Sequence, residues 1–205
     1  RIARTLERDT LLLVEHPPVI TLGRGSQPEH LPLSREALAR RGVQLFDIER
    51  GGDVTFHGPG QLVAYPIFDL TEHRRDLHWF LRALEQAFIT ALAHLHLEAE
   101  RREGLTGVWT GGRKIASIGI HVKQWVTWHG VALNVSTDLS YFDLIVPCGI
   151  RDVVMTSVQR ELGERAPRDL WGRSHDAVIL GFAETFAQRP QAVRLEDLDA
   201  VGSRP

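Results

Sequence analysis

The sequence contains very little cysteine, methionine or tyrosine. Among its 205 residues there are one cysteine, Cys148, one methionine and two tyrosines. A single cysteine excludes an internal disulfide and a zinc site built from several thiolates, and it is typical of proteins from reducing compartments. No stretch approaches the roughly 18 consecutive apolar residues of a membrane-spanning helix. The first ten residues also lack the apolar centre of a secretory signal, so we expect a cytoplasmic protein without a membrane partner.

The sequence has almost no excess of positive or negative charge. The net charge is −2, and charged residues make up 24% of the chain. A balance this close to zero argues against a nucleic-acid partner. With 43% apolar residues, the chain is long enough to bury one substantial core, and we expect a single domain over residues 1–205.

The motifs of nucleotide and metal sites are also missing. The sequence has neither a Gly-x-x-x-x-Gly-Lys-Ser/Thr loop nor a Gly-x-Gly-x-x-Gly fingerprint, and it has no His-Glu-x-x-His pair. His94 and His96 are two residues apart on a predicted helix and therefore point to different faces. We expect no metal and no cofactor.

The pattern of apolar residues predicts an α+β domain with a mixed, mostly antiparallel sheet packed against helices. Two long helices are expected, at 76–96 and 169–188. Apolar residues recur in the first at steps of three and four, from Leu77 to Leu95, and should form one inward stripe. In the second, Val178, Phe182 and Phe186 should face inward. A short helix should begin at Ser34 and end before Gly42. The predicted strands are 11–15, 19–23, 43–48, 62–68, 107–109, 113–122 and 131–135.

The segment Arg50–Gln61 contains four glycines around a threonine and a histidine. Glycines allow a ligand to approach the backbone closely, since no Cβ intervenes. The same glycines would also serve two tight turns, at Gly51-Gly52 and at Gly58-Pro59-Gly60. From these residues alone, a binding loop and a pair of turns are about equally well supported.

Lys114 and Cys148 suggest acyl chemistry if they meet in space. A free cysteine with a pKa near 8.5 is only about 3% thiolate at pH 7. A cation within roughly 4–6 Å lowers that pKa and makes the thiolate available as a nucleophile. The alternatives are that Lys114 is a solvated strand-edge charge and that Cys148 is a small buried hydrophobe.

With these residues in view, the chain resembles the lipoyl(octanoyl) transferases along most of its length. The first group of motifs comprises Glu15-His16-Pro17-Pro18, Arg50-Gly51-Gly52-x-x-Thr55-x-His57-Gly58-Pro59-Gly60-Gln61 and Gly107-Val108-Trp109. The second comprises Lys114-Ile115-Ala116-Ser117-Ile118-Gly119, His129-Gly130-x-Ala132-Leu133-Asn134 and Pro147-Cys148-Gly149-Ile150. Phe56 stands where this family often has tyrosine. The resemblance also implies a strand and a helix ahead of this chain's first residues, which the chain lacks.

The resemblance implies the fold of the biotin and lipoate protein ligases. The implied activity is transfer of an octanoyl group from acyl carrier protein to a lysine of lipoyl-dependent proteins, through a cysteine thioester. The acceptors would be the lipoyl domains of 2-oxoacid dehydrogenases and the glycine cleavage H protein. By the same resemblance, Cys148 is the nucleophile and Lys114 is its partner. The implied substrate-binding residues are Arg50, Gly51, Gly52, Asp53, Val54, Thr55, Phe56, His57, Ser117, Ile118, Gly119, Gly130, Val131 and Ala132.

Three other functions remain as alternatives. An ATP-dependent lipoate or biotin protein ligase would share the fold but need no thiol. A non-catalytic acyl-carrier-binding protein would form no covalent intermediate. A thioesterase would release free octanoate without an acceptor protein.

Overall fold

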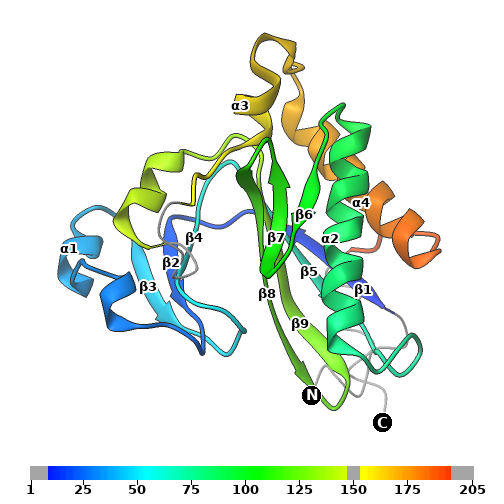
Figure 1. The fold of residues 1–205 in the computed structure, drawn as a ribbon, viewed down its shortest axis with the longest axis horizontal. Coiled ribbons are helices and arrows are strands. Elements are labelled where there is room, and N and C mark those ends of the chain that lie inside the picture. The colour runs from blue at the N-terminus through cyan, green and yellow to red at the C-terminus, as the bar shows by residue number, and fades with distance from the viewer. Residues whose placement is uncertain (1–8, 147–152, 195–205) are drawn as a thin grey trace.

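The computed structural model describes residues 9–146 and 153–194 (Figure 1). Two β-sheets face each other, and two long helices cover the outer face of the larger sheet. The large sheet is built from β1 (Thr10–Val14), β5 (Gln61–Ile67), β9 (Val126–Asn134), β8 (Arg113–Lys123), β7 (Leu105–Thr110) and β6 (Glu100–Arg102), in that order. The small sheet is built from β3 (Gln44–Asp47), β2 (Val19–Leu22) and β4 (Thr55–His57). The helices are α1 (Arg35–Ala39), α2 (Leu77–His94), α3 (Val158–Leu162) and α4 (Leu170–Phe186), with 3₁₀ turns η2 (Pro28–His30), η3 (Leu139–Leu144) and η5 (Gly163–Arg165).

Every strand pair in the large sheet is antiparallel. The small sheet is mixed, because β2 runs parallel to β3 and antiparallel to β4. The prediction of a mixed, mostly antiparallel sheet packed against helices is therefore confirmed.

The ends of helix α2 lie within two residues of those predicted. Asp76 caps its N-terminus by accepting a hydrogen bond from the backbone N–H of Trp79 at 3.0 Å. The helix ends at His94, two residues before the predicted end, where the chain turns through His96 with a φ of 59°. The predicted apolar stripe packs on the sheet, with one exception. Leu77 was expected to face inward, but it is 44% exposed in the first turn.

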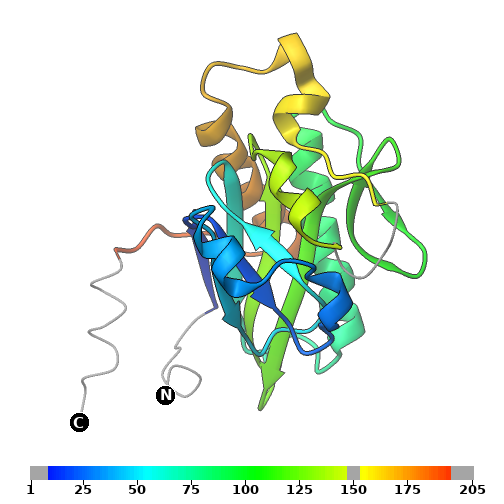
Figure 2. The same cartoon turned by 90° about the vertical axis from the view of Figure 1, so that its left-hand side faces the viewer.

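Helix α4 packs directly against α2, and Figure 2 shows both helices behind the large sheet. Asp169 caps it by accepting from the N–H of Gly172 at 3.0 Å. The backbones of the two helices touch at Gly181, where an added Cβ would lie 2.1 Å from the carbonyl oxygen of Ala87. The predicted inward residues of α4, Val178, Phe182 and Phe186, are all buried.

The small sheet has its own apolar cluster. Phe56 belongs to this cluster and is only 1% exposed. Its ring stacks on Tyr141 at 4.5 Å between centroids and meets Phe142 edge-on at 5.7 Å. Both partners belong to η3, so this cluster fixes the chain shortly before the segment that contains Cys148.

Strand β9 begins at Val126, five residues before the predicted start at Val131. His129 and Gly130 interrupt the apolar alternation, and His129 has a φ of 61°, which L-residues rarely adopt within a strand. The sequence pattern resembles a turn at this point, and only pairing with β8 keeps the strand continuous.

Among the described residues, no helix is both long and apolar enough to cross a membrane.

Candidate active site

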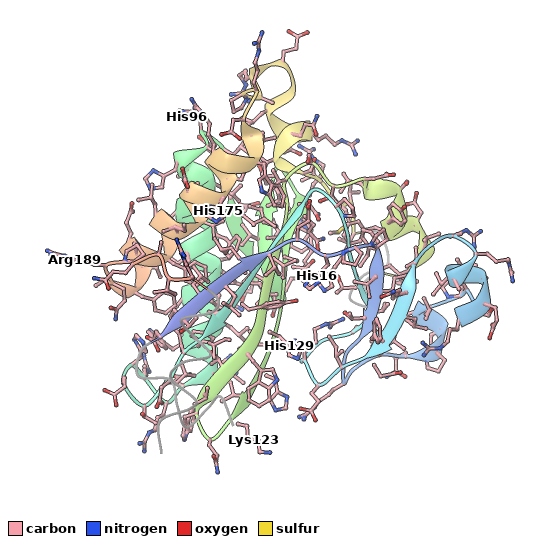
Figure 3. All side chains as sticks on the ribbon, turned by 180° about the vertical axis from the view of Figure 1, so that it is seen from behind. His16, His96, Lys123, His129, His175 and Arg189 are labelled. Carbon is pink, nitrogen blue, oxygen red and sulfur yellow. The ribbon has the colours of Figure 1, made fainter. Side chains whose placement is uncertain are left out.

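A cavity of about 520 Å³ lies between the two sheets. Its floor is formed by β5, β8 and β9, and β2, β3 and the segment after β3 supply the opposite wall. Figure 3 shows two of its histidines, His16 and His129, lying between the sheets, whereas His96 and His175 lie on the helix side. The lining residues are His16, Pro17, Val19, Thr21, Gln44, Phe46, Ile48, Arg50, Gly52, Asp53, Val54, Thr55, His57, Val63, Tyr65, Gly104, Leu105, Thr106, Lys114, Ser117, Ile118, Gly119, His129, Gly130, Val131 and Ala132.

Small residues in matching register form the floor. Ala132 of β9 pairs with Val63 of β5 on one side and with Ser117 of β8 on the other. Side chains directly opposite each other on neighbouring strands share a face. These three side chains therefore make one row across the floor, and the next pair, Gly119 and Gly130, leaves the backbone bare.

Glycine is required at both positions of that bare pair. A Cβ on Gly130 would lie 1.9 Å from the carbonyl oxygen of Ala64, and one on Gly119 would lie 2.9 Å from the carbonyl oxygen of Gly51. The Ala64 oxygen cannot move away without breaking the pairing of β5 with β9, and Gly51 is held against β8 by the hydrogen bond from its N–H to the carbonyl oxygen of Ile120 at 2.8 Å. The glycines thus bring β8, β9 and the glycine-rich segment into close contact beside the cavity.

Arg50 connects the glycine-rich segment to strand β2 through hydrogen bonds to Thr21. It is only 6% exposed, and its guanidinium donates to the carbonyl oxygen of Thr21 at 2.7 Å and to the Thr21 hydroxyl at 3.0 Å. The carbonyl oxygen of Gly52 accepts from the N–H of Gly25 at 3.0 Å, and Gly52 itself has a φ of 86°. The segment is therefore held against β2, which contains Thr21, and against the loop that follows it, which contains Gly25. The segment forms part of the cavity wall and is more than a pair of turns.

A β-bulge directs Lys114 into the cavity. Val108 pairs with Ala116 while the next residue of β7, Trp109, pairs with Lys114, so Ile115 is an extra residue on β8. Ile115 and Ala116 both belong to the core under the helices. The extra residue reverses the alternation, and Lys114 reaches the cavity face although it is only 2% exposed. Its Nζ lies 5.5 Å from the centre of the Trp109 ring.

The chain that follows the cysteine segment is hydrogen-bonded to Lys114. The Lys114 N–H donates to the carbonyl oxygen of Val154 at 2.8 Å, and the N–H of Thr156 donates to the carbonyl oxygen of Lys114 at 2.9 Å. Before the segment, the Val146 N–H donates to the carbonyl oxygen of His30 at 2.9 Å. Cys148 itself lies outside the described residues, and its predicted meeting with Lys114 stays a prediction.

A chain of side-chain amides sets the protonation pattern of His57. Asn134 must donate through Nδ2 to the carbonyl oxygen of Thr156 at 3.0 Å, because a carbonyl only accepts. Its Oδ1 then accepts from Nε2 of Gln61 at 2.9 Å. Oε1 of Gln61 lies 2.8 Å from Nδ1 of His57. The proton of the neutral imidazole therefore sits on Nδ1, and Nε2 carries the lone pair.

Burial lowers the pKa of His57 to about 4, and the nearby Arg50 acts in the same direction. Burial also lowers the pKa values of His16 and His129. The hydroxyl of Tyr65, whose pKa is raised by burial, lies 2.6 Å from Nε2 of His16. At neutral pH these four rings are uncharged, so they can donate and accept hydrogen bonds without adding positive charge beside Arg50 and Lys114.

Most of the residues implied by the resemblance lie together around this cavity. Gly51 and Phe56 do not line it. The N–H of Gly51 donates to the carbonyl oxygen of Ile120 at 2.8 Å, and Phe56 lies in the apolar cluster behind the wall. Sequence reasoning missed His16, His129 and Tyr65 as lining residues. His16 and His129 occur in the quoted motifs, and Tyr65 follows Gln61, the last residue of another motif, by four positions. It also missed Phe46, whose exposed ring lies on β3, an edge strand of the small sheet.

Asp53 is the only carboxylate among the described lining residues, and it pairs with His30. Within the described chain, no group of three or more histidines, aspartates and glutamates is arranged to hold a metal ion. The described lining combines apolar side chains with one lysine, Lys114.

Solved structures share this architecture. The chain superposes on the lipoic-acid-bound protein Ta0514 of Thermoplasma acidophilum, described as a putative lipoate protein ligase, with a TM-score of 0.76 at 18% identity, covering 98% of this chain and 83% of that one. A lipoate-protein ligase A bound with ATP gives a TM-score of 0.73 at 17% identity, with 98% and 84% covered. The fold is that of the lipoate protein ligases.

Comparison of the sequence with known proteins identifies the family. Residues 1–180 match the lipoyl protein ligase A/B catalytic domain, and the chain belongs to that family. It is 54% identical over 159 residues to a protein of Gloeobacter violaceus named octanoyltransferase, covering 78% of this chain and 69% of the relative. A Caldicellulosiruptor saccharolyticus protein of the same name is 45% identical over 206 residues, covering 98% and 85%.

Proposed function

We propose that this protein is an octanoyltransferase of lipoate biosynthesis. It takes an octanoyl group from an acyl carrier protein and transfers it to a lysine of lipoyl-dependent proteins. The acceptors are lipoyl domains of 2-oxoacid dehydrogenases and the glycine cleavage H protein, and the reaction takes place in the cytoplasm. The names of relatives at 45% and 54% identity support the reaction class.

The observation that carries the proposal is the placement of Lys114. It is a lysine almost fully removed from water that still lines the cavity. Its backbone is bonded to both Val154 and Thr156, which follow the chain's one cysteine by six and eight residues. This supports a Lys114–Cys148 pair in which the ammonium stabilises the thiolate.

In the first step the Cys148 thiolate attacks the carbonyl carbon of the octanoyl thioester. A new carbon–sulfur bond forms, and the carrier's pantetheine thiolate leaves and takes up a proton from the Lys114 ammonium, which becomes a neutral amine. One thioester replaces another, so this step is nearly balanced in energy. The octanoyl chain occupies the cavity, where each buried methylene contributes roughly 0.8 kcal/mol.

In the second step the amine of the acceptor lysine attacks the acyl-enzyme. A carbon–nitrogen bond forms, the Cys148 thiolate is expelled, and the amine loses a proton to the Lys114 side chain in its neutral form. Forming an amide from a thioester drives this step to completion. The two steps together are nucleophilic catalysis with a ping-pong order.

The remaining predicted residues bind the substrate in this proposal. The segment from Arg50 to His57 forms one wall. Ser117 to Gly119 and Gly130 to Ala132 form the floor. Phe56 supports the opposite wall from behind, and Gly51 links that wall to β8.

Intact-protein mass measurement tests the proposal. After incubation with octanoyl-loaded carrier and no acceptor, the protein should gain one octanoyl group on Cys148. Adding a lipoyl domain should remove that group and octanoylate the domain. Cys148→Ala should do neither, with Ser34→Ala as a surface control. Full transfer by Cys148→Ala would refute the cysteine mechanism.

A ligase that activates a free acid with ATP is the second candidate, because a solved neighbour with this fold is bound with ATP. Such an enzyme would octanoylate the lipoyl domain from free octanoate only when ATP is present. We expect transfer from octanoyl-carrier without ATP and none from free octanoate with it. The opposite result would assign the chain to the ligases.

A further inference from the structure

Glu85 is a fully buried carboxylate that the proposed reaction does not use. It lies on the face of α2 that packs on the large sheet and is 0% exposed, between apolar neighbours such as Leu84 and Phe88. Burying a carboxylate is costly unless its charge and its acceptor sites are satisfied. An apolar side chain of similar size would fill the same space at less cost, so a structural filler is a poor explanation for it.

Three groups satisfy Glu85. Oε2 lies 2.7 Å from Nη1 of Arg82 and 3.2 Å from Nε of Arg101. Oε1 accepts a hydrogen bond from the backbone N–H of Gly107 at 3.2 Å. The two arginines balance the charge, and the remaining oxygen is directed at β7.

Gly107 is the residue on which the Lys114 side chain lies. A Cβ added to Gly107 would be 2.7 Å from Cε and 3.3 Å from Nζ of Lys114. Gly107 has a φ of 134°, a conformation that residues with a Cβ rarely adopt. The register shift that turns Lys114 toward the cavity begins at the next residue, Val108.

We infer that Glu85 is a positioning residue for Lys114, acting through Gly107. The carboxylate holds the Gly107 peptide in its unusual conformation, and that peptide supports the lysine stem so that its ammonium faces the cavity. The acceptor oxygen performs this role, and Arg82 and Arg101 balance the charge of the carboxylate. This inference rests on the proposed pairing of Lys114 with Cys148.

The readout is the pH at which Cys148 becomes reactive. The rate of alkylation by iodoacetamide is measured from pH 5 to 10 on the folded protein, and its midpoint reports the thiolate. An unassisted thiol gives a midpoint near 8.5. We expect a lower midpoint in the native protein and a midpoint close to 8.5 in Lys114→Met.

The Glu85 variants separate positioning from packing. Glu85→Gln retains an acceptor oxygen and should keep the midpoint within about 0.3 pH units of the native value. Glu85→Met fills the space but cannot accept, and it should raise the midpoint by about one unit, a tenfold loss of thiolate at pH values well below both midpoints. Leu84→Ala, a cavity-forming neighbour on the same helix, should lower the melting temperature and leave the midpoint unchanged.

Glu85→Asp provides a second route if Glu85→Met does not fold. It keeps the charge but is one methylene too short to reach Gly107 while paired with both arginines, and the same upward shift is expected. A native midpoint in a folded Glu85→Met or Glu85→Asp variant would overturn the inference. A native midpoint in Lys114→Met would instead overturn the proposed Lys114–Cys148 pair, so the two failures are distinguishable.

Discussion

The side-chain oxygen of Asn134 accepts a hydrogen bond from Nε2 of Gln61 at 2.9 Å, 73 residues away in sequence. Asn134 is the only asparagine in the chain and is 1% exposed. Through this contact, a residue of β9 orients the amide that faces His57, and its own amide reaches Thr156 beyond the cysteine segment. The amide chain thus joins the glycine-rich segment to the chain after Cys148.

Replacing Asn134 with aspartate should break that chain. The new carboxylate would face the carbonyl oxygen of Thr156 with no proton to donate, and two buried acceptors repel each other. Leaving buried groups unsatisfied costs about 1–3 kcal/mol, and more for a charged group. We expect a stability loss of about 3 kcal/mol in urea unfolding and at least a tenfold loss of octanoyl transfer. Gln124→Glu makes the same chemical change in an exposed turn and should leave both unchanged; similar behaviour of the two variants would contradict the role of the amide chain.

His57 should make the protein less stable in mild acid. Its pKa is lowered by burial to about 4, whereas in the unfolded chain it returns to about 6.5. As the pH falls from 6.5 toward 4, the unfolded state takes up a proton that the folded state does not, and stability declines. The loss amounts to about 3 kcal/mol.

Urea unfolding at several pH values between 4 and 7.5 measures this decline. His57→Gln removes the titrating group and should flatten the curve, although His16 and His129 leave a smaller slope of the same sign because their pKa values are also lowered. His175→Gln is the control, on an exposed side chain of α4. Equal slopes in native protein and His57→Gln would show that His57 is not the group responsible.

Filling the cavity floor should shorten the preferred acyl chain. Ala132 lies in the middle of the row formed with Val63 and Ser117. Ala132→Leu would occupy space that the end of an octanoyl chain needs, at roughly 0.8 kcal/mol, or about fourfold in kcat/KM, for each methylene displaced. Assays with butanoyl, hexanoyl and octanoyl carriers should show the preference moving toward the shorter chains. Ala39→Leu, on the exposed end of α1, should retain the native order; a native order in Ala132→Leu would place the acyl chain elsewhere.

Gly130→Ala should disrupt the site through the backbone. The added Cβ would lie 1.9 Å from the carbonyl oxygen of Ala64, and neither strand can move without losing its pairing. Overpacking of this kind typically costs 1–3 kcal/mol and sometimes more, so we expect a loss of about 3 kcal/mol in thermal or urea unfolding. Gly42→Asn is the control, because Gly42 has open space around it and a φ of 71° that asparagine tolerates. A fully stable Gly130→Ala protein would contradict the close approach of β5 and β9.

Much of the fold could be predicted from the sequence because its signals are local. The caps Asp76 and Asp169, together with the three- and four-residue apolar spacing, specify α2 and α4 to within two residues. The six motifs also led to the family, which the comparison with known proteins confirms. The full length of β9 was missed because His129 and Gly130 look like a turn when only neighbouring residues are considered.

Residue types in the sequence determined the helices, most strands and the set of residues that could do acyl chemistry, since side-chain spacing and turn chemistry act over a few positions. Tertiary structure alone decided that Lys114 faces the cavity, because an extra residue on one strand is visible only against its partner. It also decided the proton position on His57, because His57 donates to the side-chain oxygen of Gln61, whose amide is oriented by Asn134 on another strand. Such choices depend on groups far apart in the chain, and folding is what places them within hydrogen-bonding distance.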